Sequence, residues 1–420
     1  MKTYQKPYKT INNNSDSAVT LRVNMEAVMH EVGAGLRRLG EEAALRVMEI
    51  AMERERQRLV DEGAGYRHGA QQGWGVVNGH KLGVPHLRVR GRRGEIPLES
   101  YKAFQRTDEL SQRAYVSLMR GMSARDYSRA GQEFASGHGL SKTAADANFM
   151  READERLRQL LERDLSELDI TAIFMDGKGF GDTMVIAAIG VCSDGSKVAL
   201  GIWQGTTENA VVCQSLLKDL TRRGLDAAKP YLFVIDGGKG LRAAILAVFG
   251  ANAFVQRCQE HKRRNVKEHL PDNLQLEYRR KLNAAYGMAD YGGAMSALEA
   301  CVSELGRVNP SAARSLEEGL EETLTLHRLD LPDELRKSLR TTNCIESAFS
   351  QVGYRTGRVK RWRDGVQVQR WAGCALLMAE ERWHKVHGWR LLGRLREAME
   401  RQLKQRQERE TRELNLQARS

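Results

Sequence analysis

Two aspartates stand directly after short apolar runs of the chain, and each is followed by glycine. Asp176 follows the run 173–175, and Asp236 follows the run 232–235. Apolar runs bounded by glycine predict buried strands, and the glycine lets the backbone turn away where a strand ends. Two ionised carboxylates at neighbouring strand ends repel each other unless a cation offsets their charge. The pair therefore predicts a site for a hard divalent metal ion; the alternative is two turn aspartates that only end their strands.

The elements expected around these aspartates form a meander of strands followed by alternating helices and strands. Turns are expected at Gly181-Asp182 and at residues 193–195. The expected strands are 171–175, 184–191, 197–203, 231–235 and 253–257, with helices at 208–223 and 240–249. This order predicts an α/β fold with a ribonuclease-H-like core, in which a mixed sheet is flanked by helices.

The rest of the chain is expected to be mainly helical. Residues 17–65 have a helical pattern that Gly33 and Gly35 should divide into two helices, and LRVRGRRGEIPL predicts a hairpin around residues 91–94. In the next region, Ser123 and Ser141 are expected helix N-caps on either side of a break at 137–139, which is a helix-turn-helix outline. The expected regions are a disordered tail (1–16), an N-terminal helical region (17–65), a basic β-hairpin region (66–107), a helix-turn-helix-like DNA-binding region (108–168), the first segment of the ribonuclease-H-like core (169–261), a helical insertion (262–340), the second segment of the core (341–375) and basic C-terminal helices (376–420).

The composition predicts a polyanionic partner inside the cell. Lys and Arg exceed Asp and Glu by 66 − 54 = 12, and the excess lies on both sides of the aspartates, at 67–106 and 352–420. No apolar run approaches the roughly 20 residues of a membrane span, and the first 16 residues do not have the apolar segment of a signal peptide. Six cysteines without a repeating spacing indicate reduced thiols. We therefore expect a cytoplasmic protein, associated with the nucleoid when it binds DNA, with no membrane partner.

Four motifs carry a resemblance to a known family. They are FMDG, VIDGGKGLRAAI, VQRCQEHKRRNVKEHLP and LRTTNCIESAFSQVGYRTGRVKRWRDG, and the last two are long and specific. Through them the chain resembles the Mutator-type bacterial insertion-sequence transposases, a branch of the DDE transposases, over roughly residues 90–395. The resemblance implies a catalytic, metal-binding triad at Asp176, Asp236 and Glu346, with Asp182 as the only close competitor for the first position.

The resemblance also implies the cofactors, the partners and the reaction. Two Mg²⁺ (or Mn²⁺) ions would hydrolyse the phosphodiester and activate the 3′-hydroxyl that attacks target DNA. The partner would be double-stranded DNA, at the element's terminal inverted repeats and at the target. A homodimer or higher oligomer is expected, because two DNA ends must be brought together.

Further residues are candidates for DNA contact or for support of the site. Cys258 and His261 have half of a zinc spacing without a matching second pair, so structural zinc is not expected. The family resembled has a Cys-x-x-His signature at this place, which implies a structural pair near the metal ligands, with His261 contacting DNA or a carboxylate; the alternative is that both residues simply pack. Trp362 could stack on an unpaired base or belong to the core. The expected phosphate contacts, for which the alternative is a solvated face, are Lys262, Arg263, Arg264, Lys267, Arg355, Arg358, Lys360, Arg361 and Arg363, with Arg90, Arg92 and Arg93 of the hairpin.

Two other functions remain open from the sequence. One is a related metal-dependent nuclease or integrase that does not transpose, and the other is a non-catalytic DNA-binding regulator. The glycine-rich stretch after Asp236 does not have the spacing of a phosphate-binding P-loop, so nucleotide hydrolysis has no support.

Overall fold

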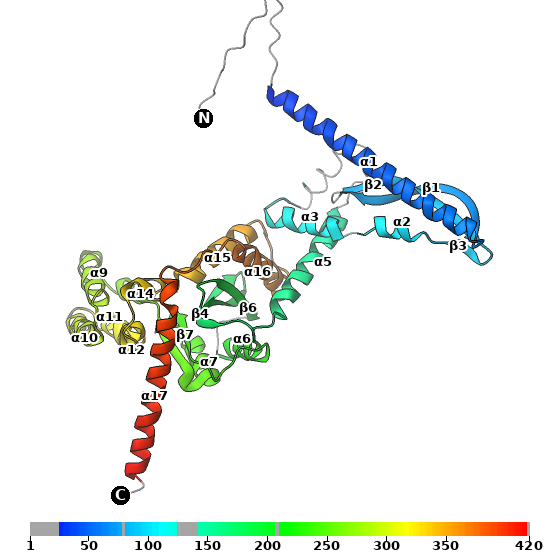
Figure 1. Ribbon diagram of the computed structural model, residues 1–420. Helices are drawn as coiled ribbons and strands as arrows, with labels where there is room; N and C mark the ends of the chain where they lie inside the picture. The colour runs from blue at the N-terminus through cyan, green and yellow to red at the C-terminus, as the bar shows by residue number, and fades with distance from the viewer. Residues whose placement is uncertain are drawn as a thin grey trace, which may run out of the picture. The chain divides into compact units, whose positions relative to one another are not determined.

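The computed structural model describes residues 25–77, 80–106, 108–123, 126, 142–205 and 210–417. These residues belong to two compact units, which meet in the chain at residues 107 and 108. Figure 1 shows the elements of each unit. None of the described helices is long and apolar enough to cross a membrane.

The first unit packs one long helix on a small antiparallel sheet. Helix α1 (Met25–Asp61) is followed by strands β1 (Tyr66–Val77), β2 (His80–Gly91) and β3 (Gly94–Ile96), in the order β1-β2-β3, and by α2 (Glu99–Phe104). Met48 and Met52 of α1 are buried against apolar residues of β2. The division of α1 at Gly33 and Gly35 was wrong, because a glycine inside a helix costs only about 1 kcal/mol relative to alanine and does not by itself end it.

The hairpin predicted around residues 91–94 is confirmed, since Gly91 pairs with Gly94 across the β2–β3 turn. Strand β1 was not predicted. It pairs along almost the whole of β2, but its sequence YRHGAQQGWGVV is rich in glycine and glutamine and has little of the apolar alternation that indicates a strand.

The second unit is built around a mixed five-stranded sheet. Its strands are β4 (Ile170–Phe180), β5 (Thr183–Cys192), β6 (Lys197–Gly205), β7 (Tyr231–Ile235) and β8 (Ala253–Arg257), in the order β6-β5-β4-β7-β8. The first three are antiparallel, and β7 and β8 run parallel to β4. The predicted meander and its two turns are confirmed. One expectation was wrong: β4 does not end at Asp176, which pairs with Ala187, but continues to Phe180.

Helices cover both faces of this sheet, which confirms an α/β fold (Figure 1). Side chains alternate between the faces along a strand. Ile173 and Met175 of β4 pack in the core formed with α6 (Ala210–Arg222) and α7 (Lys239–Phe249). Phe174 and Phe180 pack in the opposite core, formed with α5 (Lys142–Leu161), α15 (Asn343–Thr356) and α16 (Gly365–Glu380). Asp176 has the same parity as Phe174, so β4 presents it on the side of α15.

Residues 262–340 are helical, as predicted, and have a core of their own that includes Leu282, Leu298 and Leu316. The predicted boundary at residue 261 nevertheless falls inside α8, and the boundary at residue 375 falls inside α16. The helices of this region are α8 (Gln259–Glu268), α9 (Asp272–Tyr286), α10 (Tyr291–Val308), α11 (Pro310–Glu317), α12 (Leu320–Thr323), α13 (Thr325–Arg328) and α14 (Asp333–Leu339). The last elements of the described residues are the short helix η2 (Trp389–Leu391) and α17 (Leu392–Gln417).

The helix-turn-helix prediction is only partly covered by the described residues. Helices α3 (Asp108–Met119) and α5 flank the region, and the Ser123 hydroxyl accepts a hydrogen bond from the Asp126 N–H at 3.0 Å, as an N-cap does. The predicted break at 137–139, the second cap Ser141 and the tail 1–16 lie outside the described residues.

Candidate active site

The parallel register of β4 and β7 places Asp176 beside Asp236. Ala172 pairs with Leu232 and Phe174 with Val234, so the same register, continued by two residues, matches Asp176 with Asp236. Neighbouring strands lie about 4.8 Å apart. Burial, and then the negative charge of Asp236, raise the pKa of the Asp176 carboxyl to about 6. Two carboxylates so close, one of them reluctant to ionise, form a site that attracts a cation.

Local backbone bonds hold both carboxylates in place. The Asp176 Oδ1 accepts a hydrogen bond from the Gly177 N–H at 2.8 Å, and the Asp236 Oδ1 accepts one from the Gly238 N–H at 2.9 Å. Gly237 has a φ of 112°, which favours glycine and lets the chain turn from β7 toward α7. The predicted turn after Asp236 is therefore present, whereas Asp176 is held by the strand itself.

Glu346 lies in the first turn of α15, the helix that packs against β4. Its charge is a further cause of the raised pKa of Asp176, so the three predicted carboxylates share one electrostatic environment. The Glu346 Oε1 accepts a hydrogen bond from the Thr342 hydroxyl at 2.5 Å. Thr342 is fully buried and is the residue that precedes α15. The sequence reasoning missed it, because its hydroxyl does not cap the helix but donates to the side chain of Glu346, four residues later.

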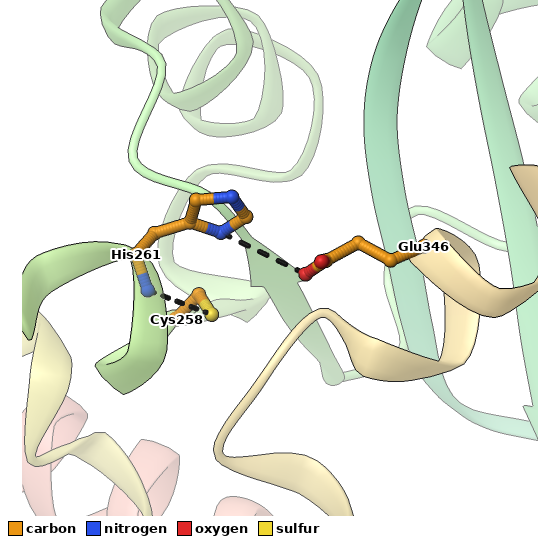
Figure 2. A group of neighbouring side chains, drawn as sticks. All are labelled: Cys258, His261 and Glu346. Carbon is orange, nitrogen blue, oxygen red and sulfur yellow. Dashed lines mark hydrogen bonds and ion pairs between the residues drawn. The ribbon is translucent and has the colours of Figure 1, made fainter. Parts of the chain in front are cut away.

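Cys258 and His261 lie against Glu346, as Figure 2 shows. The Cys258 Sγ accepts hydrogen bonds from the backbone N–H groups of His261 and Thr342, each at 3.4 Å. The His261 Nδ1 is 3.1 Å from the Thr342 Oγ1 and 3.9 Å from the Glu346 Oε1. The structure therefore joins the pair to a predicted triad member 85 or more positions away in the chain (346 − 261 = 85).

Hydrogen bonds within this cluster shift its titrations. Burial works to raise the pKa of the Cys258 thiol, but the hydrogen bonds from His261 and Thr342 outweigh it, and the pKa lies below its ordinary value. The hydrogen bond between Cys258 and His261, together with the negative charges of Cys258 and Glu346, raises the pKa of His261. Both shifts favour a charged thiolate–imidazolium pair.

Lys178 is a second residue that the sequence reasoning missed. It lies two residues after Asp176 on β4 and therefore on the same face. Its Nζ is 6.0 Å from the centroid of the Phe349 ring, and a Cβ added at Gly353 would lie 3.9 Å from it, so the ammonium faces α15. Within the described part of the chain, no carboxylate forms an ion pair with it. The Lys178 ammonium is therefore a cation on the same face of β4 as Asp176.

The basic residues predicted to contact phosphate fall into different environments. Arg264 and Lys267 are exposed on α8, and Arg358, Lys360, Arg361 and Arg363 are exposed after α15. Arg355 is half-buried in the last turn of α15. Arg90, Arg92 and Arg93 are exposed on the β2–β3 hairpin of the first unit.

Three predicted DNA contacts are engaged within the protein. Lys262 is wrong as a phosphate contact: it is buried, its ammonium donates to the carbonyls of Ser315 and Glu318 at 2.6 Å each, and burial lowers its pKa to about 8. Arg263 pairs with Glu260 and lies over the Tyr286 ring. Trp362 is half-buried and packs edge-to-face against Phe180, with ring centroids 5.8 Å apart.

Comparison with known proteins places the chain among transposases. Residues 23–386 match the family model described as "Transposase, Mutator family". The chain is 32% identical over 245 residues to the transposase for insertion sequence element IS6120 of Mycolicibacterium smegmatis, an alignment that covers 57% of this chain and 74% of that protein. It is 28% identical over 373 residues to the transposase for insertion sequence element ISRM5 of Rhizobium meliloti, covering 84% of this chain and 90% of that protein.

Proposed function

Because this chain belongs to the Mutator family of transposases, we propose that it cuts DNA at the terminal inverted repeats of an insertion sequence and joins the freed 3′-hydroxyl ends to target DNA. Two observations support the proposal: the register of β4 and β7 matches Asp176 with Asp236, and the charges of Asp236 and Glu346 both act to raise the pKa of Asp176. In this proposal the three are catalytic residues and metal ligands.

The strand order supports a ribonuclease-H-like core. Three antiparallel strands in chain order, followed by two strands parallel to the first, give the order β6-β5-β4-β7-β8. The proposed triad then comes from the central strand β4, from the end of the adjacent strand β7, and from a helix on the side of β4 that Asp176 faces. The helical insertion between Asp236 and Glu346 folds around its own core, so its length does not interrupt the site.

The donor set fits hard divalent ions. Carboxylate oxygens are the ligands that Mg²⁺ and Mn²⁺ prefer. Burial, and then the negative charges of Asp236 and Glu346, raise the pKa of Asp176, so a bound cation would favour its ionised form. Two such ions would activate water or a 3′-hydroxyl and stabilise the leaving oxygen during in-line displacement. Asp176 and Asp236 would hold them from the sheet and Glu346 from α15, while the Thr342 hydroxyl orients the Glu346 carboxylate.

The proposed partner is double-stranded DNA. The exposed residues Arg264 and Lys267, together with the cations after α15, would contact its phosphates, and Lys178 would contact a phosphate beside the carboxylates. We propose the first unit, with its basic hairpin, as a further DNA-binding region. We also propose a dimer or larger assembly that acts in the cytoplasm on DNA.

The test is cleavage and strand transfer on labelled DNA that carries the element's own ends, with Mg²⁺ present. Asp176→Asn, Asp236→Asn and Glu346→Gln should each lose both reactions while keeping DNA binding, and Asp182→Asn should remain active. An active Asp176 variant would contradict the triad. Cleavage without preference for the element's ends would favour a nuclease that does not transpose, and binding without cleavage under Mg²⁺ or Mn²⁺ would favour a regulator.

A further inference from the structure

We propose that Cys258, His261 and Glu346 form a second metal site, which takes a zinc-class ion and withdraws Glu346 from the proposed Mg²⁺ site. The expected inhibition of DNA cleavage rests on the proposed function, whereas the expected binding of the metal ion does not. Of the described His, Cys, Asp and Glu residues, these three are brought together as a possible ligand set, with one ligand atom from each within 4.8 Å of the others.

The spacing of the ligand atoms is close to that of a tetrahedral zinc site. Zinc binds sulfur at about 2.3 Å and nitrogen or oxygen at about 2.0–2.2 Å, so neighbouring ligand atoms lie roughly 3.5 Å apart. The His261 Nδ1 and the Glu346 Oε1 are already 3.9 Å apart. Rotation of the side chains that moves their ligand atoms by about 1 Å would bring the Sγ, Nδ1 and Oε1 to the separations of a zinc site. Water or another small ligand would take the fourth position, as in open zinc sites.

The chemistry of the donors selects the ion. A sulfur, an imidazole nitrogen and a carboxylate oxygen form the mixed set that suits zinc, whereas Mg²⁺ takes oxygen ligands. The same set cannot serve the hard ions that Asp176 and Asp236 attract. Two classes of metal would therefore compete for Glu346, which is the one carboxylate common to both groups.

The surrounding backbone holds the ligands together. The N–H of Gln259 donates to the carbonyl of Arg340 at 3.0 Å, and the N–H of Thr342 donates to the Cys258 Sγ, so the starts of α8 and α15 are joined at two points. Backbone N–H groups that donate to a cysteine sulfur stabilise its thiolate form, which is the form that binds metal. The Thr342 hydroxyl donates to the Glu346 carboxylate, as an outer partner of a metal ligand does. The same hydroxyl oxygen lies 3.1 Å from the His261 Nδ1, from which a bound metal ion would displace the proton.

Cobalt(II) is the probe for this site, because a cobalt–thiolate bond gives a charge-transfer absorption band that oxygen and nitrogen ligands do not. The full-length protein, reduced and freed of metal, should bind one Co²⁺ with this band, and Zn²⁺ should displace it. Cys258→Ser should lose the band. His261→Asn, which changes a half-buried ring and leaves the sulfur in place, should weaken Co²⁺ binding by about tenfold or more. Cys301→Ser, at a buried cysteine of the insertion core, is the matched control and should keep the band.

The activity arm uses the DNA cleavage assay with Mg²⁺. Zn²⁺ should inhibit the wild type, added Mg²⁺ should relieve the inhibition, and Cys258→Ser should be at least about tenfold less sensitive to Zn²⁺. If the wild type shows no thiolate band, or if the band is unchanged in Cys258→Ser, the metal site is refuted. Cys258 and His261 would then only help to position Glu346 through hydrogen bonds. Asp236→Asn should keep the band and lose cleavage. If the wild type shows no band, the metal site is refuted. If the Asp236→Asn variant still cleaves DNA, the proposed function is refuted, and the two results are independent.

Discussion

Replacing Asp176 with asparagine should stabilise the metal-free protein at neutral pH while removing the proposed chemistry. The Asp176 pKa is raised from 3.8 to about 6, a difference of about 2.2 units (6 − 3.8). At 1.36 kcal/mol per unit, the ionised carboxylate lowers the stability of the folded protein by up to about 3 kcal/mol. Asparagine removes the charge and keeps an oxygen for the Gly177 N–H. We therefore expect a gain of about 1–3 kcal/mol.

The pH dependence has a definite sign. Because the folded pKa of Asp176 lies above the unfolded value, the folded protein retains a proton that the unfolded chain releases. The stability of the wild type is therefore highest below about pH 4 with respect to this group, and it falls as the pH rises through about 6. The advantage of Asp176→Asn should be full at about pH 8 and should vanish at about pH 4.

Thermal unfolding in EDTA at these two pH values measures the effect. A gain of about 1–3 kcal/mol corresponds to a rise of several degrees in the midpoint of thermal unfolding, since domains of roughly 150–250 residues shift by about 2–4 °C per kcal/mol. Millimolar Mg²⁺ should reduce the difference at the higher pH, because a bound ion stabilises only the wild-type site.

Asp194→Asn is the matched control. Asp194 lies in the β5–β6 turn, where hydrogen bonds from Ser196 hold its pKa at about 2, so asparagine there should bring no gain at high pH. A metal-free Asp176→Asn protein that is no more stable than the wild type at about pH 8 would refute the reasoning that repulsion and burial strain this carboxylate.

Other substitutions separate roles that charge alone cannot distinguish. Lys178→Met should weaken DNA binding and reduce the slope of log K against log salt concentration by about 1, the value of one phosphate contact, and Lys178→Arg should restore the slope. An unchanged slope would mean that Lys178 does not contact DNA. Arg264→Met should reduce the slope in the same way. By contrast, Lys262→Met, two residues away in the chain, should leave the salt slope unchanged. It should lower the free energy of unfolding by on the order of 1–3 kcal/mol in denaturant titration, because two partly buried carbonyls lose their donor. Arg223→Met should cost about 3 kcal/mol by the same measurement, since buried Arg223 pairs with Asp219 at 2.8 Å and donates to three backbone carbonyls; a loss below about 1 kcal/mol would contradict this.

Much of the second unit could be predicted from short windows of sequence. The apolar runs before Asp176 and Asp236 predicted strands because burial on both sides selects continuous β-branched and aromatic residues, and the bounds of β7 and β8 match the prediction residue for residue. The helical insertion was equally visible from its period. Strand β1 was not, because it is stabilised by pairing with β2 rather than by its own composition.

The tertiary structure decided which of these residues meet. Register between β4 and β7 places Asp176 beside Asp236, and no local pattern specifies a register between strands about 60 residues apart. The same holds for the sulfur, ring and carboxylate of Cys258, His261 and Glu346, which two helix starts bring together. For Lys262 the tertiary structure contradicts the prediction. Its charge predicted an exposed side chain, but the packing of α8 on α11 buries it. Residue type and period act over a few neighbours in the chain, whereas burial, strand register and shared ligands arise from contacts between distant segments. The sequence by itself therefore determined the secondary-structure elements and the candidate carboxylates. Only the tertiary structure decided which residues lie next to one another.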